Sequence, residues 1–309
     1  GEGEPEATPE SGPWTFTLAG PSYISFMKFG ARRDVREQLY LAFLNRASSG
    51  DLDNKPLIDR ILALRAEAAS LLGYETYAEM SLASKMAPSV DTVLELLESL
   101  RAPAFPAAER DYADIRAFAA EHGQQEELAH WDVGYWSERL KESRFDYDEE
   151  SLRPYFPVDR VLGGLFGLIE RLFSVSIEQV TDGSVPVWNP DVRYYRVREE
   201  GEEIAGFYLD LYSRPADKRG GAWMNICLQR RRYRGQVQIP VAYLVCNQTP
   251  PTSDRPSLMT FDEVRTLFHE FGHGLQHMLT RVDYAEAAGI GGIEWDAMEL
   301  PSQFMRSEE

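Results

Sequence analysis

The sequence predicts a mainly α-helical fold with a small antiparallel β-sheet. Apolar residues recur at helical spacing through most of residues 32–122. Short segments rich in aromatic and β-branched residues follow from residue 186, and helical spacing returns at Thr260. At 309 residues, the chain is long enough for one large domain or two ordinary domains, each with its own core.

The chain divides into three predicted parts. Residues 1–13 are acidic and rich in Pro and Gly, so they can bury too little apolar surface to fold and are expected to be disordered. Residues 14–185 are expected to form a helical part, and residues 186–309 the small sheet and the last helices. Because the chain begins at Gly1 and not at Met, we expect an excerpt of a longer protein, with any targeting sequence outside it.

Each predicted element has its own sequence signal. The helices show apolar residues three and four positions apart, and the third begins at a Ser89 cap and ends before Pro103. After residue 148 the pattern breaks at prolines and resumes as an apolar helix up to residue 173. The first four predicted helices cover residues 34–47, 59–73, 89–102 and 108–122. The predicted strands cover residues 192–198, 205–213, 220–229 and 239–248.

The composition excludes several classes of protein. A net charge of −18 argues against a nucleic-acid partner, because phosphate binding needs an excess of Lys and Arg. The sequence contains no run of about 18 apolar residues, which argues against a membrane-spanning helix. Cys227 and Cys246 are too few for a disulfide framework and are expected to be buried thiols in a reducing compartment. The basic run from Arg230 to Arg234 is interpreted as a solvated turn between two strands, with a contact for an acidic peptide or partner as the alternative.

The segment TLFHEFGHGLQHML, residues 266–279, contains three of the five histidines of the chain. Thr260 and Glu263 form a capping-box pattern before it, which predicts a helix. His269 and His273 then lie about one turn apart on one face, where both imidazoles can reach one metal ion. Glu270 is displaced around the helix, so its carboxylate can reach a water molecule without binding the metal. This is the H-E-x-x-H pattern of zinc peptidases, and two exposed histidines on an amphipathic helix are the alternative.

A zinc site of this kind needs a third protein ligand. His277 lies eight residues beyond His269, about 12 Å along the helix axis, which is too far for metal–ligand bonds of roughly 2 Å. His122 and His130 belong to no motif, so a carboxylate from the following helix is expected. The acids in that helix are Glu294, Asp296 and Glu299, and their spacing alone does not choose among them.

Several long segments resemble one family. FHEFGHGLQHMLT, EWDAMELPSQFM, KRGGAWM and YLDLYSR resemble the oligopeptidase A branch of the thimet oligopeptidase family of zinc metallopeptidases, and the resemblance runs from about Trp14 to Met305. NRASSGDLDN and CNQTPPTSDRPSLMTF are most similar to the plant and algal organellar members. The resemblance implies a thermolysin-like zincin core in a helix-rich protein of two lobes, with a deep channel that admits only short peptides. It also implies a monomer in an organelle (chloroplast or mitochondrion) or in the cytosol.

The resemblance also implies the roles of the site residues. Glu299, which precedes the L-P-S step, matches the third zinc ligand beside His269 and His273, so one Zn²⁺ per chain is expected. Glu270 matches the catalytic glutamate. The expected function is a zinc-dependent metalloendopeptidase that hydrolyses short peptides with a metal-activated water and a glutamate general base.

Other residues are weaker candidates. Asp296, Ser302 and Gln303 lie about one turn from Glu299 and could orient the ligands, or could be ordinary helix-surface or packing groups. Gly221, Ala222 and Trp223 could belong to an edge strand that pairs with the substrate backbone, or to an internal strand. Gly289, Gly291 and Gly292 are interpreted as a plain helix connection, with a mobile substrate loop as the alternative.

The sequence departs from the family pattern after Met305. Family members continue with a Glu-Asn-Trp step, whereas this chain reads Arg-Ser-Glu-Glu. The resemblance implies that an N-terminal helical segment and the C-terminal helical portion, with the oxyanion-stabilising side chains, are absent. Such stabilisation is a large catalytic contribution. Two alternatives to a partial view of an active oligopeptidase therefore remain: a truncated product that binds zinc and peptide without cleaving, and a structural interaction protein with an incidental histidine cluster.

Overall fold

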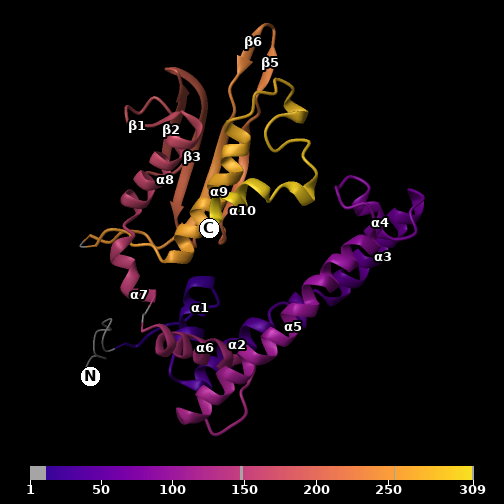
Figure 1. The fold of residues 1–309 in the computed structure, drawn as a ribbon, viewed down its shortest axis with the longest axis vertical. Helices are drawn as coiled ribbons and strands as arrows, with labels where there is room; N and C mark the ends of the chain where they lie inside the picture. Colours follow the sequence, from indigo (N-terminus) through magenta and orange to yellow (C-terminus); the bar gives the residue numbers. More distant parts are fainter. Residues whose placement is uncertain (1–11, 147–148, 254, 308–309) are drawn as a thin grey trace. The chain divides into compact units, whose positions relative to one another are not determined.

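The computed structural model describes residues 12–146, 149–253 and 255–307, and about half of the chain is helical (Figure 1). It forms two compact units, one from residues 1–80 with 89–147 and one from residues 81–88 with 148–309. The predicted disordered segment lies, up to residue 11, outside the described residues. The division predicted at residue 186 falls inside the second unit, after a first strand at Ser176–Val180. Among the described residues, no helix is both long enough and apolar enough to cross a membrane.

The first unit is built from helices. Its elements are α1 (Gly20–Phe29), α2 (Arg33–Leu44), α3 (Lys55–Leu71), the start of α4 (Tyr77–Leu82), α5 (Val90–Glu121) and α6 (His130–Phe145). Ser89 caps α5 as predicted, because its side-chain oxygen accepts a hydrogen bond from the Thr92 amide.

The predicted break at Pro103 is wrong. One continuous helix, α5, contains both Pro103 and Pro106. Each proline lacks the amide that would bond to the carbonyl four residues earlier. Those carbonyls belong to the exposed residues Ser99 and Ala102, where water can take the place of the missing donors.

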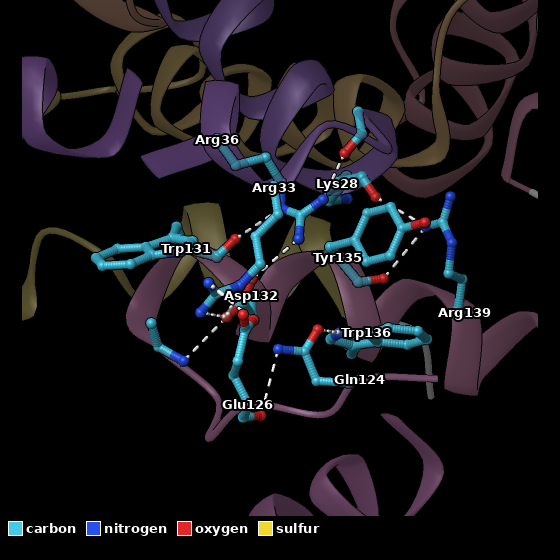
Figure 2. Close-up of polar contacts among 12 residues, drawn as sticks. Lys28, Arg33, Arg36, Gln124, Glu126, Trp131, Asp132, Tyr135, Trp136 and Arg139 are labelled. Carbon is cyan, nitrogen blue, oxygen red and sulfur yellow. Dashed lines mark hydrogen bonds and ion pairs between the residues drawn. The ribbon is translucent and has the colours of Figure 1, made fainter. Parts of the chain in front are cut away.

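A buried ionic network stabilises the first unit (Figure 2). The Asp132 carboxylate in the first turn of α6 is fully buried. It accepts hydrogen bonds from Arg33 at 3.0 Å, from Arg36 at 2.9 Å and from the Ala129 amide at 3.0 Å. Arg36 is itself only 2% exposed and also donates to the Trp131 carbonyl. These bonds join α2 to the start of α6.

The second unit contains a five-stranded sheet in the order β1-β2-β3-β7-β4. Its strands are β1 (Ser176–Val180), β2 (Arg193–Glu199), β3 (Glu202–Tyr212), β4 (Trp223–Leu228) and β7 (Val241–Gln248). The predicted antiparallel sheet is wrong in one respect, because β3 and β7 pair in parallel while the other neighbours are antiparallel. The sheet is therefore mixed. A parallel pair needs a crossover, and here the segment between β3 and β7 contains β4 and a two-stranded hairpin. Strand β1 was not predicted.

The core lies on one face of this sheet, against α8 (Val158–Phe173) and α9 (Phe261–Met278) (Figure 1). Phe166 of α8, Phe207 of β3 and Phe271 of α9 contact one another there, with ring centroids 5.4 to 6.1 Å apart. This packing fixes α9, the helix with the H-E-x-x-H pattern, on the sheet. The short helices α7 (Glu149–Leu152) and α10 (Leu300–Arg306) complete the α-helices of the unit.

The basic run from Arg230 to Arg234 contributes to a small hairpin. Strands β5 (Arg231–Tyr233) and β6 (Gln236–Gln238) pair outside the main sheet (Figure 1). Arg230 and Arg232 both donate to the Asp283 carboxylate. The interpretation as a simple solvated turn is therefore incomplete, because two of the four arginines of the run are held in ion pairs.

Both cysteines are free, as predicted. Cys246 is buried, and burial raises the pKa of its thiol to about 12. Cys227 is only partly buried, so the expectation of two buried thiols holds fully for Cys246 alone.

Candidate metal centre

Helix α9 begins as the sequence predicts. Thr260 caps it, since the Thr260 side chain accepts from the Glu263 amide at 3.1 Å and the Glu263 carboxylate accepts from the Thr260 amide at 2.7 Å. This capping box fixes where the helix starts. It therefore fixes which face carries His269 and His273.

Three side chains converge beside α9. Nε2 of His269 lies 3.2 Å from Oε2 of Glu299, and Nε2 of His273 lies 3.4 Å from the same oxygen. One ligand atom from each of the three residues lies within 4.8 Å of the other two. Among the described residues, no other group of three His, Cys, Asp or Glu side chains is close enough to hold a metal ion together.

These distances fit a tetrahedral metal ion. Zinc bonds to His nitrogen and carboxylate oxygen at about 2.0–2.2 Å, so ligand atoms around a tetrahedral ion lie on the order of 3.4 Å apart. The same distances would also suit a charged histidine–carboxylate pair. However, burial lowers the pKa of His269 and so favours the neutral ring, although the Glu299 charge opposes this shift. A neutral imidazole is the form that binds metal.

Glu299 reaches the histidines because α10 lies unusually close to α9. A Cβ added to Gly272 would lie 2.5 Å from the Pro301 carbonyl oxygen and 2.6 Å from the Ser302 Cα. Any larger residue at position 272 would push the two helices apart. Glu299 stands directly before α10, so this contact determines its position.

Glu270 lies beside the three candidate ligands but is not grouped with them. Its side chain is buried, and burial together with the nearby Glu299 charge raises the pKa of its carboxyl to about 7, against the effect of a hydrogen bond from the Met224 amide. A carboxyl that titrates near neutral pH can both accept and release a proton.

The predicted last helix is shorter than expected, because Asp296 lies in a separate 3-10 turn (Trp295–Ala297) and α10 begins only at Leu300. The three weaker candidates near Glu299 differ in their contacts. Ser302 is fully buried, and its hydroxyl donates to Oε2 of Glu299 at 2.7 Å. Gln303 is exposed, and its amide makes the ordinary helix bond to the Glu299 carbonyl. Asp296 uses both carboxylate oxygens to accept bonds from the Met86 and Ala87 amides. Of the three, the structure brings the Ser302 side chain into contact with a candidate ligand.

His277 lies apart from this group, as the helix rise predicts. It is fully buried, and its Nε2 lies 3.0 Å from the Leu228 carbonyl oxygen. Gly289 packs directly on it, because a Cβ there would lie 2.7 Å from Nδ1 of His277. Gly289 also has a φ of +61°, which favours glycine. This glycine is therefore required for packing.

Gly221, Ala222 and Trp223 lie where β4 begins. Strand β4 is at the edge of the sheet, so the edge-strand interpretation of this segment agrees with the strand order. The Met224 amide of the same strand contacts Glu270. The edge therefore runs past the candidate general base.

Two residues of the site were not predicted. Gly272 and Met224 act through backbone approach, which leaves little trace in a single sequence. An isolated glycine inside a helix does signal close packing, and this signal could have identified Gly272.

The sequence matches a known protein family over most of its length. The model of "Peptidase family M3" matches residues 26–307. The chain is 54% identical over 99% of its length to organellar oligopeptidase A, chloroplastic/mitochondrial, of Arabidopsis thaliana. It is 47% identical over 98% of its length to oligopeptidase A of Salmonella typhimurium, and 29% identical over 94% to saccharolysin of Saccharomyces cerevisiae.

The chain spans only part of these relatives, covering 39%, 45% and 42% of their respective lengths. The match nevertheless includes α9, α10 and the sheet between α8 and α9. The resemblance seen in the sequence is thereby confirmed, and the chain belongs to peptidase family M3.

Proposed function

We propose that this chain forms the zinc-binding part of a metalloendopeptidase that hydrolyses short peptides. The observation that carries the proposal is the convergence of His269, His273 and Glu299 around one point, with Glu270 beside it. The names of the relatives support the substrate class, since several are oligopeptidases. We further propose a thermolysin-like core, one Zn²⁺ per chain, and a monomer.

His269, His273 and Glu299 would hold the ion, and Ser302 would hold the carboxylate of Glu299. When bound, zinc supplies Lewis acidity that polarises a peptide carbonyl and lowers the pKa of a water ligand towards about 7.

Glu270 would carry the proton through the reaction. Beside a divalent cation its carboxyl titrates lower than the value of about 7 found without one, so it would be ionised at neutral pH. It would accept a proton from the attacking water and donate it to the amine of the leaving peptide. Burial keeps bulk water from competing for that proton.

The edge of β4 would align the substrate. Gly221, Ala222 and Trp223 lead into this edge strand, and an extended peptide can add to such an edge through backbone hydrogen bonds. The side chain of Trp223 is 41% exposed and could contact the bound peptide.

The test separates zinc binding from catalysis. We expect Glu270→Gln to bind about one zinc per chain but to lose peptide cleavage, and His273→Ala to lose both. Zinc would be measured by metal analysis, and cleavage with a quenched short peptide with and without chelator. Normal turnover by Glu270→Gln would refute its role as base.

A second possibility is that the chain binds zinc and peptide without cleaving. Zinc binding without chelator-sensitive cleavage by the unaltered chain would support it. A chain that binds no zinc would instead indicate a structural protein.

The relatives include chloroplastic/mitochondrial and cytosolic proteins, and we propose one of these locations for this chain.

A further inference from the structure

On the edge of β4 that faces away from β7, only some of the backbone amides and carbonyls are free to bond with a peptide. In an antiparallel pair, consecutive residues point their backbone groups alternately towards the partner strand and away from it. The Ile226 amide bonds to the Asn225 side chain, so Ile226 faces outward. By alternation, Ala222 and Met224 face outward as well, which agrees with the hydrogen bond from the Met224 amide to Glu270.

On the C-terminal side of Met224, the side chain of Asn225 occupies a backbone amide of this edge. Its Oδ1 accepts a hydrogen bond of 2.8 Å from the Ile226 amide. The first outward amide after Met224 is therefore already bonded within the chain. A peptide lying along the edge would have to displace this bond in order to pair there.

A β-bulge follows directly. The pairing of β4 with β7 shifts between Ile226 and Leu228, so that Cys227 is an extra residue on the edge strand. Bulges twist an edge and end its pairing, and proteins use them to prevent unwanted strand addition. Both features act on the same side of Met224.

On the N-terminal side of Met224, the segment that leads into β4 is bonded to β7. Nδ2 of Asn247 in β7 donates to the carbonyls of Arg219 and Gly221. These bonds continue the attachment to β7 past the start of β4. No partner for either backbone group of Ala222 is found among the described residues. Up to Met224, the open outward groups are thus the amide and carbonyl of Ala222 and the carbonyl of Met224.

We infer that Asn225 is a specificity-determining residue that ends the peptide-binding edge after Met224. The inference rests on the proposed function, and it deepens it by giving the substrate a length limit on one side. An extended peptide pairs its backbone with Ala222 and Met224. Residues that it carries beyond this point gain no bond from the Ile226 amide, which Asn225 already holds.

Two variants test the inference. Asn225→Ala removes the acceptor and frees the Ile226 amide, while Asn225→Asp keeps an oxygen acceptor at the same place. Three labelled peptides are compared by fluorescence anisotropy with the zinc-loaded protein: a short peptide, the same peptide extended at its N-terminus, and the same peptide extended at its C-terminus.

For the unaltered protein we expect equal affinity for the short peptide and for the peptide extended past Asn225. For Asn225→Ala, one extended peptide should bind roughly three- to tenfold more tightly than the short one, the effect of about one added backbone hydrogen bond. Only one end should show the gain, because the strand has one direction. Asn225→Asp should behave like the unaltered protein. Amide hydrogen exchange at Ile226 should be faster in Asn225→Ala.

Several results would overturn the inference. They are no gain for either extension in Asn225→Ala, an equal gain in Asn225→Asp, unchanged exchange at Ile226, or no binding of any peptide by the unaltered protein. The proposed function fails separately, if the unaltered protein shows no chelator-sensitive hydrolysis of the short peptide. The binding comparison does not depend on hydrolysis, so the two failures are distinguishable.

Discussion

Gly272 in α9 lies directly against Ser302 in α10, so close that a Cβ at position 272 would come within 2.6 Å of the Ser302 Cα. The obstructing atoms belong to the backbone and cannot swing aside as a side chain can. The packing of the two helices therefore depends on a hydrogen atom at this position. Glu299 stands immediately before α10, so the same contact sets its distance from the histidines.

We predict that Gly272→Ala moves α10 away from α9 and weakens zinc binding. Overpacking of this kind costs roughly 1–3 kcal/mol of stability, and the displacement of Glu299 should reduce zinc affinity as well. Equilibrium dialysis with metal analysis would measure the affinity, and thermal unfolding the stability.

Gly274→Ala is the matched control, since Gly274 is also buried in α9. A Cβ there would lie 3.1 Å from the end of the flexible Leu244 side chain, which can move. A loss of zinc affinity as large as that of Gly272→Ala would contradict the explanation.

Ser302→Ala should weaken zinc binding without unfolding the protein. The hydroxyl donates to the Glu299 oxygen that lies closest to both histidines, so its loss leaves that carboxylate less well oriented. Loss of such a supporting bond typically lowers metal affinity by about 10- to 100-fold. A competition titration with a zinc indicator would measure the change.

Gln303→Ala serves as the comparison because Gln303 is exposed on the same helix. It should leave zinc affinity within about twofold of the unaltered value, as expected for a surface change. Equal effects of the two substitutions would argue against a positioning role for Ser302.

Zinc should stabilise the protein through Glu299 and not through Glu294. Ligands that bind only the folded state raise its stability, by about 2.7 kcal/mol at a zinc concentration 100 times the Kd. We expect added zinc to raise the thermal midpoint of the unaltered protein and of Glu294→Gln, and to have little effect on Glu299→Gln.

This comparison also addresses the choice between Glu294 and Glu299, which their spacing in the sequence leaves open. Chelator should reverse the rise in midpoint. A midpoint that rises equally in Glu299→Gln would place the third ligand elsewhere.

Local signals predicted much of the fold. The helix caps at Ser89 and Thr260 lie where the capping residues indicated, because capping depends on residues only a few positions apart. The parallel pairing of β3 with β7 could not be predicted in this way, since the residue pattern of a strand does not show whether its neighbour runs parallel or antiparallel to it. The helix end predicted at Pro103 was wrong for a related reason. Whether a helix tolerates proline depends on whether water can reach the carbonyl that loses its hydrogen bond.

The candidate site divides along the same line. His269, Glu270 and His273 share one helix turn, so their spacing alone predicts their arrangement. Glu299 was identified through resemblance, because nothing local links it to α9. The close approach at Gly272 and the backbone contact of Met224 with Glu270 depend on elements far apart in the sequence.

The last prediction concerns the pH dependence of the first unit. Burial acts to raise the pKa of Asp132, but hydrogen bonds from Arg33, the Ala129 amide and Arg36 outweigh it, so the pKa lies below the ordinary 3.8. A carboxyl whose pKa is lowered by folding stabilises the folded state above its unfolded pKa. That stability is lost as the pH falls through the folded pKa.

Asp132→Asn should therefore cost most at neutral pH and least in acid. At pH 7 the substitution leaves Arg36 buried without its charged partner, which typically costs roughly 3–5 kcal/mol. Below about pH 4 the carboxyl takes up its proton first in the unfolded chain, and at still lower pH, below its lowered pKa, in the folded protein, so the difference between the two proteins should shrink. Amide hydrogen exchange in α6, measured at both pH values, would report the stability of this unit.

Asp114→Asn is the control for a surface ion pair, because Asp114 and Arg144 are each about half exposed at 2.6 Å separation. Solvent screens such a pair, so its loss should cost at most about 1 kcal/mol at either pH. If Asp132→Asn destabilised α6 by the same amount at both pH values, the effect would come from altered packing. The lowered pKa of Asp132 would then contribute nothing to stability.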